Sequence, residues 1–353
     1  MKFIVKIYIF FRKLHLARPS MNSLNFHITY FCFFNVLCIL HANEIHQFSS
    51  KCMGTEFKIL IDHDIEKNCS VAAKNAFDEA KRLNSIFSDY DADSELSKLS
   101  YSSHSDEKII LSDELFEVLE FSKLLANKTD GAFDPTLGQL SRLWRISRFR
   151  MTLPTNKSII RAMDSVGFEH LILNNTQKEA ILNKPGTILD LGGIAKGYTA
   201  DRMMLILKNM GFTRCLIDAG GDITIGNPPR GQKGWKIEIG GRKHPDLPIL
   251  QLSNCSIATS GDIEQFVKIG NIQYSHILNP KTGYGLKNIS QVTIIANNGI
   301  TADSYATAAS VLGPEKTFNL LIQNSPHRAF FLCQKLSGVE LLVFQDQEFD
   351  LEK

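Results

Sequence analysis

The sequence lacks the charge imbalance that nucleic-acid-binding proteins usually carry. Its 39 Lys and Arg residues are nearly matched by 37 Asp and Glu residues, which leaves a formal net charge of +2 over 353 residues. Past residue 48 there is no linker, low-complexity tract or internal repeat. With 44% hydrophobic and 22% charged residues, the composition is that of a globular protein that acts on a small molecule or another protein, and nucleic acid is not an expected partner.

Cysteine pairs with the spacing of metal or redox sites are also absent. None of the 7 cysteines forms a C-x-x-C pair, which disfavours a zinc ribbon or a thioredoxin-like motif. The cysteines are scattered, and Cys32 and Cys38 lie in an N-terminal apolar stretch. This pattern favours small buried hydrophobic side chains over a disulfide framework.

The N-terminal apolar run, from about residue 26 to residue 40, is too short for a comfortable membrane span, which needs about 20 residues. Basic residues recur between Lys2 and Arg18 ahead of it, and Ala42 follows it. This order is typical of a secretory signal, and a buried N-terminal helix is the alternative. We therefore expect residues 1–42 to be a signal or anchor segment that exports the protein to the periplasmic face of the inner membrane.

A lipoprotein signal is not supported. Such a signal needs a cysteine after small residues, but Cys38 follows bulky Leu37 and Cys52 follows Lys51. The mode of attachment to the membrane, if the segment is retained, is left open.

Hydrophobic patterning predicts one compact α+β domain over residues 48–345, followed by a short tail over 346–353. Ser112 and Asp113 resemble the N-cap of a helix, and Gly211 and Gly313-Pro314 read as helix ends. Helices are predicted over 71–87, 111–126, 158–166, 195–210 and 302–312. Strands are predicted over 53–61, 188–190, 215–217, 223–225, 235–239, 249–252, 256–259, 292–295, 329–332 and 339–344. Because most strands lie in the second half, we expect a largely antiparallel sheet flanked by helices.

A glycine turn between a predicted strand and a predicted helix is the first candidate site. The run from Asp190 to Tyr198 reads DLGGIAKGY. Glycines let backbone amides approach an anion closely, a helix N-terminus carries partial positive charge, and Lys196 adds a point charge for a diphosphate. The run is not a P-loop, since no Ser or Thr follows the lysine. An ordinary turn with a solvated lysine is the alternative interpretation.

Asp303 and Thr307 form the second candidate site. On a helix, residues four positions apart face the same way. A carboxylate and a hydroxyl on one face suit magnesium, which prefers oxygen ligands. The alternative is an aspartate N-cap and a threonine packed in a helix of small residues.

Two further features bear on chemistry. His276 precedes an Asn279-to-Gly283 turn (NPKTG) and is a candidate general base, although a lone histidine is more often structural. Phe133, in the loop from Gly131 to Thr136, can stack on a flat ring, although phenylalanines usually belong to the core.

Taken together and in this order, the motifs resemble the ApbE family of FAD:protein FMN transferases, from about residue 48 to about residue 345. The resemblance implies an ApbE-like (T-fold-like) domain. The matching runs are 53–55, 87–90 with 93–96, 131–136, 190–198 with Asp201, 218–222, 258–262, 276–283 and 302–313.

The resemblance also implies roles for individual residues. The main-chain carbonyl of Gly193 and the side chains of Asp303 and Thr307 would bind Mg²⁺, with Ala306 at the same site. Lys196 would lie near the diphosphate of FAD, and the run 260–262 would form a polar wall. The residues implied around FAD are Met53, Tyr90, Ala132, Phe133, Asp134, Asp190, Lys196, Ser260 and His276, the last also as the catalytic base.

The implied reaction moves FMN from FAD to a Thr or Ser hydroxyl of an acceptor protein and releases AMP. The implied acceptors are flavoprotein subunits of membrane redox complexes that carry a Ser/Thr target motif. A magnesium-dependent FAD pyrophosphatase, a non-catalytic FAD-binding protein and a structural exported protein are the alternatives. One departure from the family is Asn279, which stands where an aspartate is common and removes one charge beside the site.

Overall fold

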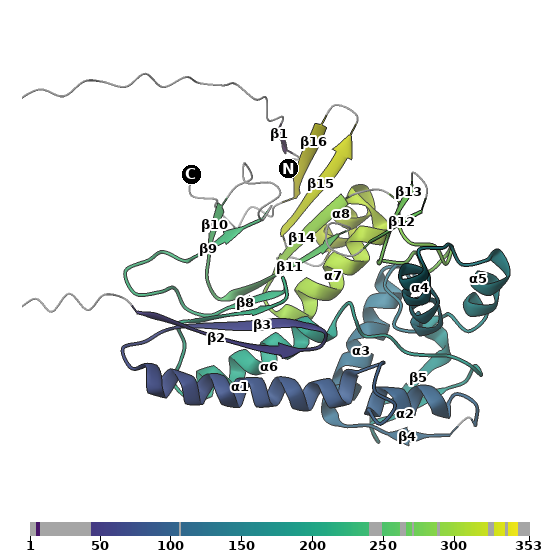
Figure 1. Cartoon of the computed structure of the whole chain (residues 1–353), viewed down its shortest axis with the longest axis horizontal. Helices are drawn as coiled ribbons and strands as arrows, with labels where there is room; N and C mark the ends of the chain where they lie inside the picture. Colours follow the sequence, from purple (N-terminus) through teal and green to yellow (C-terminus); the bar gives the residue numbers. More distant parts are fainter. Residues whose placement is uncertain are drawn as a thin grey trace, which may run out of the picture.

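The computed structural model describes residues 5–7, 44–105, 107–239, 249–261, 266–269, 272–287, 290–323, 328–335 and 338–344 (Figure 1). Most of the predicted signal or anchor segment, and the whole of the predicted tail, therefore lie outside the described residues. Within the described part, no helix combines the length and the apolar composition that crossing a membrane requires.

A nine-stranded sheet runs through the molecule in the order β1-β16-β15-β14-β11-β8-β7-β3-β2. All eight neighbouring pairs are antiparallel. Its strands are β1 (Val5–Ile7), β2 (Ile45–Cys52), β3 (Thr55–Asp62), β7 (Cys215–Ala219), β8 (Ile223–Ile225), β11 (Cys255–Gly261), β14 (Ser290–Ala296), β15 (Arg328–Lys335) and β16 (Gly338–Phe344). The expected α+β class with a largely antiparallel sheet is confirmed.

Three small sheets accompany the large one. They are β4 (Ile109–Ile110), β6 (Glu179–Leu182) and β5 (Leu171–Asn174); β9 (Trp235–Glu238) with β10 (Ile249–Leu252); and β12 (Phe266–Ile269) with β13 (Ile272–Ser275). The sequence predicted β9 and β10, whereas it did not predict β4, β5, β6, β12 and β13.

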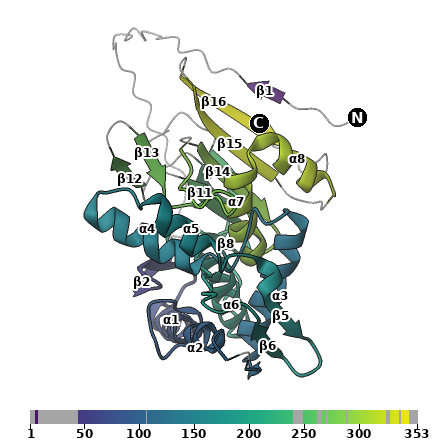
Figure 2. The same cartoon turned by 90° about the vertical axis from the view of Figure 1, so that its right-hand side faces the viewer.

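Helices cover the sheet and build the region beside it (Figures 1 and 2). The helix α6 packs on β7, α1 packs on α6, and α7 packs on β11 and β14. The helices are α1 (Glu66–Phe87), α2 (Glu95–Ser102), α3 (Asp113–Lys128), α4 (Gly138–Arg150), α5 (Asn156–Met163), α6 (Ala195–Asn209), α7 (Gly299–Leu312) and α8 (Pro314–Gln323), with a short 3₁₀ helix, η1 (Phe168–His170). Ser112 caps α3 as expected, since its hydroxyl accepts a hydrogen bond from the N–H of Leu115 at 3.3 Å.

Some predicted elements are wrong in detail. Met53 does not begin a strand: Met53 and Gly54 have φ angles of 47° and 75° and form the turn between β2 and β3. The segment 188–190 does not form a strand. Ile188 makes only an isolated β-bridge with Leu137, because the pairing does not extend to the neighbouring residues. Pro314 starts α8 instead of only ending α7, because proline is well tolerated in the first turn of a helix.

Among the residues whose side chains the structure describes, the free cysteines are Cys52, Cys69, Cys215 and Cys255. All are buried and carry free thiols. They pack in the cores beside the large sheet, as expected for small hydrophobic side chains.

The crossing of α6 and α7 positions the candidate site. An added Cβ atom on Gly197 would lie 2.1 Å from the carbonyl oxygen of Gly299, so the two backbones meet with no room for a side chain. The carboxylate of Asp201 on α6 accepts hydrogen bonds from the N–H groups of Gly299 (2.7 Å) and Ile300 (3.0 Å) at the start of α7. Burial raises the pKa of Asp201 to about 6 despite these two donors.

This raised pKa makes the contribution of Asp201 to stability depend on pH. The folded carboxyl holds its proton more tightly than the unfolded one, so its contribution is fully present below pH 4 and is lost as the pH rises through 6. We expect the stability that Asp201→Ala removes to be larger at pH 4 than at pH 7, by about 2 kcal/mol. Urea unfolding at both pH values measures this, with exposed Asp164→Ala as the control; an equal cost at both pH values would contradict the assignment.

Candidate active site

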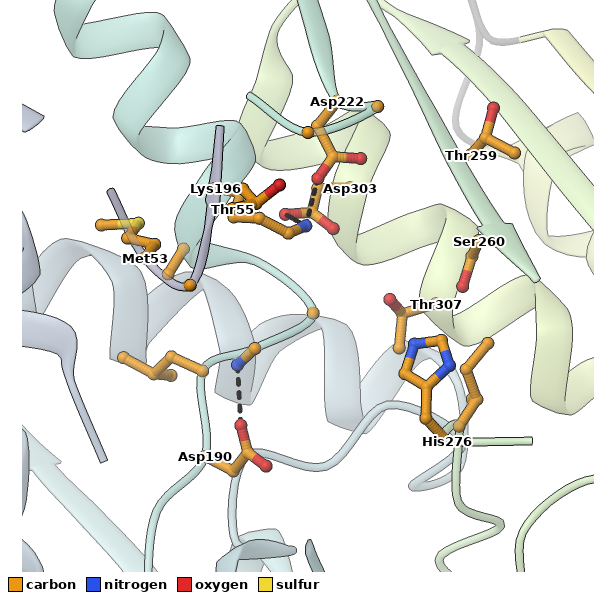
Figure 3. Close-up of a pocket in the computed structure, with 18 of the residues that line it drawn as sticks. Met53, Thr55, Asp190, Lys196, Asp222, Thr259, Ser260, His276, Asp303 and Thr307 are labelled. Carbon is orange, nitrogen blue, oxygen red and sulfur yellow. Dashed lines mark hydrogen bonds and ion pairs between the residues drawn. The ribbon is translucent and has the colours of Figure 1, made fainter. Parts of the chain in front are cut away.

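A cavity of about 1460 Å³ opens between the β2–β3 turn, the loop before α4, the glycine turn before α6, the β7–β8 turn, β11, the segment after β13, and α7 (Figure 3). Most residues implied by the resemblance line it, although they come from distant parts of the chain. These residues are Met53, Tyr90, Ala132, Phe133, Asp134, Asp190, Gly193, Lys196, Ser260, His276, Asp303 and Thr307.

Ala306 is the candidate that does not line the cavity. It is 2% exposed and packs in the core, and its carbonyl oxygen accepts a hydrogen bond from the hydroxyl of Ser310 at 3.0 Å. The side chain of Ala306 therefore contributes to packing behind the cavity.

The glycine turn and α7 meet at the base of the cavity. An added Cβ atom on Gly193 would lie 2.8 Å from Oγ1 of Thr307, so only glycine allows this approach. One turn along α7, Oδ2 of Asp303 accepts a hydrogen bond from the N–H of Gly197 at 3.0 Å. Two segments that are more than 100 residues apart are thus joined where the sequence predicted a magnesium site.

A charged cluster lies beside this junction. Nζ of Lys196 forms an ion pair with Asp222 and lies 3.7 Å from Oδ2 of Asp303. Burial, and then repulsion by Asp303, raise the pKa of Asp222 to about 7, although Lys196 opposes the shift. Burial alone would lower the pKa of Lys196, but attraction by the two carboxylates outweighs it and raises this pKa.

The oxygen atoms here fit a magnesium ion. Among the described residues no three His, Cys, Asp or Glu side chains gather as a metal site, so a hard cation would need hydroxyl or main-chain oxygens as well. Thr307 supplies a hydroxyl next to Gly193, and Asp303 supplies a carboxylate one turn earlier on α7, beside Gly197. When both carboxylates are ionised, Asp222 and Asp303 outnumber the single charge of Lys196, which favours a further cation.

Two other carboxylates at the cavity mainly shape the backbone. Oδ1 of Asp190 accepts a hydrogen bond from the N–H of Gly192 at 2.8 Å and so holds the glycine turn. Asp134 is 7% exposed, and its two oxygens accept hydrogen bonds from both the N–H and the hydroxyl of Thr136 and from the N–H of Phe168. Burial raises the pKa of Asp134.

Apolar and aromatic side chains form part of the cavity wall. Met53 adopts a left-handed backbone in the β2–β3 turn, which places it between two core clusters. Phe133 is a core residue, as the alternative interpretation held, and it also lines the cavity. Tyr90 is 78% exposed and lies 4.1 Å below the guanidinium of Arg145.

His276 follows β13 directly and its side chain is exposed on the cavity. Figure 3 shows its imidazole on the same side as Thr307 and Ser260. The turn after it forms with asparagine, since Oδ1 of Asn279 accepts a hydrogen bond from the N–H of Lys281 at 2.9 Å. Asp262, the end of the expected polar wall, lies outside the described residues.

The sequence did not single out Asp222 or Arg145. Asp222 follows two glycines in the run DAGGD, a pattern that could have marked it as a residue presented by a tight turn. Nη1 of Arg145 lies 2.5 Å from Asp89 and Nη2 lies 3.6 Å from Asp190. The arginine-rich run of α4 was the available signal for it.

Known proteins resemble this chain in sequence and in fold. The chain is 28% identical over 301 residues to an FAD:protein FMN transferase of Klebsiella pneumoniae, covering 83% of this chain and 90% of that protein. It is 30% identical over 293 residues to an FAD:protein FMN transferase of Vibrio cholerae, covering 79% and 84%. The crystal structure of the ApbE protein of Thermotoga maritima matches with a TM-score of 0.77 and 27% identity, over 88% of this chain and 100% of that chain.

Because sequence relatives over most of the chain are FAD:protein FMN transferases and the fold is that of the ApbE crystal structure, the chain is a transferase. More particularly, the chain belongs to the ApbE family, whose model matches residues 53–331. A variant of the flavin transferase ApbE of Vibrio cholerae has the same fold, with a TM-score of 0.77 and 26% identity over 85% of this chain and 97% of that chain.

Proposed function

We propose that this protein is a magnesium-dependent FAD:protein FMN transferase that attaches FMN to a Thr or Ser hydroxyl through a phosphoester bond and releases AMP. The names of its relatives support the activity. The observation that carries the proposal is the approach of Gly193 to Thr307, and of Gly197 and Lys196 to Asp303, in one cavity. At about 1460 Å³, this cavity lies above the roughly 300–1,000 Å³ range of ordinary small-molecule sites, so it is large enough for a dinucleotide.

The residues that would hold Mg²⁺ are Asp303 and Thr307, with a main-chain oxygen of the Gly193 turn. When bound, the ion would withdraw negative charge from the diphosphate and stabilise AMP as a leaving group. Lys196 adds a positive charge at the same end of the cavity, and it is held there by Asp222 and Asp303.

His276 is the group that would take the proton of the acceptor hydroxyl. In the proposed step, a bond forms between the hydroxyl oxygen and the phosphorus next to riboflavin, and the bond from that phosphorus to the AMP oxygen breaks. An imidazole near neutral pH suits this role, and its exposed position lets a protein substrate reach it.

We propose export and a membrane-associated acceptor as parts of this function. The order of basic residues, apolar run and Ala42 in the first 42 residues supports a signal or anchor segment. The acceptors would be flavoprotein subunits of membrane redox complexes that present their Ser/Thr target at the periplasmic face.

One assay tests the proposed reaction. The protein is incubated with FAD, Mg²⁺ and a flavoprotein fragment that carries a candidate threonine, and AMP and in-gel flavin fluorescence are followed. Transfer predicts AMP together with a fluorescent acceptor. AMP without a labelled acceptor would instead show an FAD pyrophosphatase, and FAD binding without AMP would show a non-catalytic binding protein.

Replacement of His276 tests its role as the base. We expect His276→Ala to slow turnover by about 100-fold, within the range that general base catalysis contributes, while FAD affinity changes much less. The rate of AMP release and the FAD dissociation constant measure the two effects separately. Lys268→Ala, an exposed change on the neighbouring β12, is the control, and an unaltered turnover rate in His276→Ala would remove His276 from the mechanism.

A further inference from the structure

A second hollow, of about 440 Å³, lies outside the cavity between the 89–92 loop, the end of α2 and α4. Asp89, Tyr90 and Arg145 line both spaces. The outer hollow therefore adjoins the catalytic cavity across these three residues. A chain seated in the hollow would have its next residues beside the cavity.

The hollow is walled by exposed side chains of the kind that protein interfaces use. Tyr90 and Tyr101 are 78% and 53% exposed, and Ile146 is 50% exposed. Arg142 and Ile146 lie four residues apart on α4, and Phe149, which is 91% exposed, continues the same face one turn later. Tyrosine and arginine are enriched at binding hot spots, so this face has the composition of an interface.

Ile146 and Phe149 are not part of the core, because the opposite face of α4 is the one that packs against the protein. Leu140, Trp144 and Ser147 are buried on that side. The indole N–H of Trp144 donates a hydrogen bond to the carbonyl of Gly283 at 2.8 Å, which fixes the rotation of the helix. Because the other face of α4 is packed, Ile146 and Phe149 stay exposed to solvent. Binding residues that are already in place need less ordering when a partner binds.

The helix side of the hollow is basic, whereas the 89–92 loop on its other side carries Asp89 and Asp91, and Asp89 forms an ion pair with Arg145. Residues 138–163, which include α4 and α5, contain no Asp or Glu, whereas the chain as a whole is nearly neutral. The basic residues of this stretch are Arg142, Arg145, Arg148, Arg150, Lys157 and Arg161. The partly or fully exposed arginines of α4 beyond this ion pair therefore attract an acidic partner.

We propose that the outer hollow and the exposed face of α4 form the docking site for the acceptor protein, binding a segment with acidic and apolar side chains next to its target hydroxyl. This inference rests on the proposed transferase function and names where its protein substrate binds. A hollow beside the cavity, walled by tyrosine, arginine and isoleucine side chains, suits a protein segment.

The double variant Ile146→Ser/Phe149→Ser tests the docking site, since neither residue lines the catalytic cavity. We expect the KM for a soluble flavoprotein fragment with acidic residues beside its threonine to rise about tenfold or more, with the FAD dissociation constant unchanged. The matched control is Leu124→Ser/Leu205→Ser, which removes two exposed leucines from α3 and α6. A fragment whose acidic residues are changed to amides should raise the KM of the wild type in the same way.

The outcomes separate this inference from the proposed function. If the wild type labels the fragment but the double variant keeps the same KM, the docking site is overturned and the transferase function stands. If the variant keeps its KM but no longer co-sediments with phosphatidylglycerol vesicles, the face binds membrane and the inference is equally overturned. A wild type that labels no acceptor overturns both.

Discussion

Asp303→Asn is expected to lower magnesium-dependent AMP release on the order of 100-fold or more, the scale seen when one electrostatic group at a reacting centre is removed. The carboxylate of Asp303 accepts a hydrogen bond from the N–H of Gly197 at 3.0 Å. It lies near Lys196, and one turn before Thr307 on α7, at the base of the cavity. An amide oxygen still accepts that hydrogen bond, but it lacks the charge that a cation requires. The AMP release rate at several Mg²⁺ concentrations measures the loss.

The choice of asparagine matters because alanine would have a second effect. Asp303→Ala would leave the buried N–H of Gly197 without its acceptor, which costs about 1–3 kcal/mol of stability. Ser304→Ala is the control on the same helix, since Ser304 is buried but its hydroxyl bonds only to carbonyls of α7. Full activity of Asp303→Asn at low Mg²⁺ would exclude Asp303 as a metal ligand.

The sequence predicted the framework of the site because the relevant segments have strong local signals. The spacing of apolar residues and the flanking glycines place α6 and α7 to within about a turn of their observed ends. Four residues separate Asp303 from Thr307, so their common face follows from helix geometry alone. That this face meets the turn of Gly193 required the resemblance, since no local pattern pairs two segments so far apart.

The charged cluster shows what a linear pattern cannot give. Asp222 lies in the β7–β8 turn and Lys196 lies on α6, and only the packing of α6 on β7 brings them into contact. The repulsion that raises the pKa of Asp222 needs the third partner, Asp303, from α7. Each of these three residues taken alone has an ordinary structural interpretation.

The mouth of the cavity was predicted least well because α4 was not recognised. Its exposed face carries Ile146 and Phe149 among arginines, so its hydrophobic pattern is that of a helix with apolar residues on two sides. Met53 was assigned to a strand because alternation continues through it, whereas its left-handed backbone belongs to a turn. In both α4 and the turn at Met53, side chains that face solvent or the cavity interrupt the hydrophobic pattern from which helices and strands are predicted.

The remaining structural requirement is the close crossing of α6 and α7, and it can be tested at Gly197. A methyl group there would lie 2.1 Å from the carbonyl oxygen of Gly299 and 2.8 Å from Cβ of Asp303. Backbone atoms cannot rotate away, so the two helices would have to separate. Any separation moves Asp303 and Thr307 away from Gly193 and Lys196, which couples the stability of the fold to the geometry of the site.

We therefore expect Gly197→Ala to lower the free energy of unfolding by about 3 kcal/mol, at the upper end of overpacking effects, and to abolish AMP release in the fraction that stays folded. Leu205→Ala is the control, since Leu205 is an exposed residue on the same helix and does not line the cavity. Urea unfolding and single-turnover AMP release measure the two losses. Because the helices carry the two halves of the site, a Gly197→Ala protein that is destabilised yet fully active would show that the reaction does not depend on their contact.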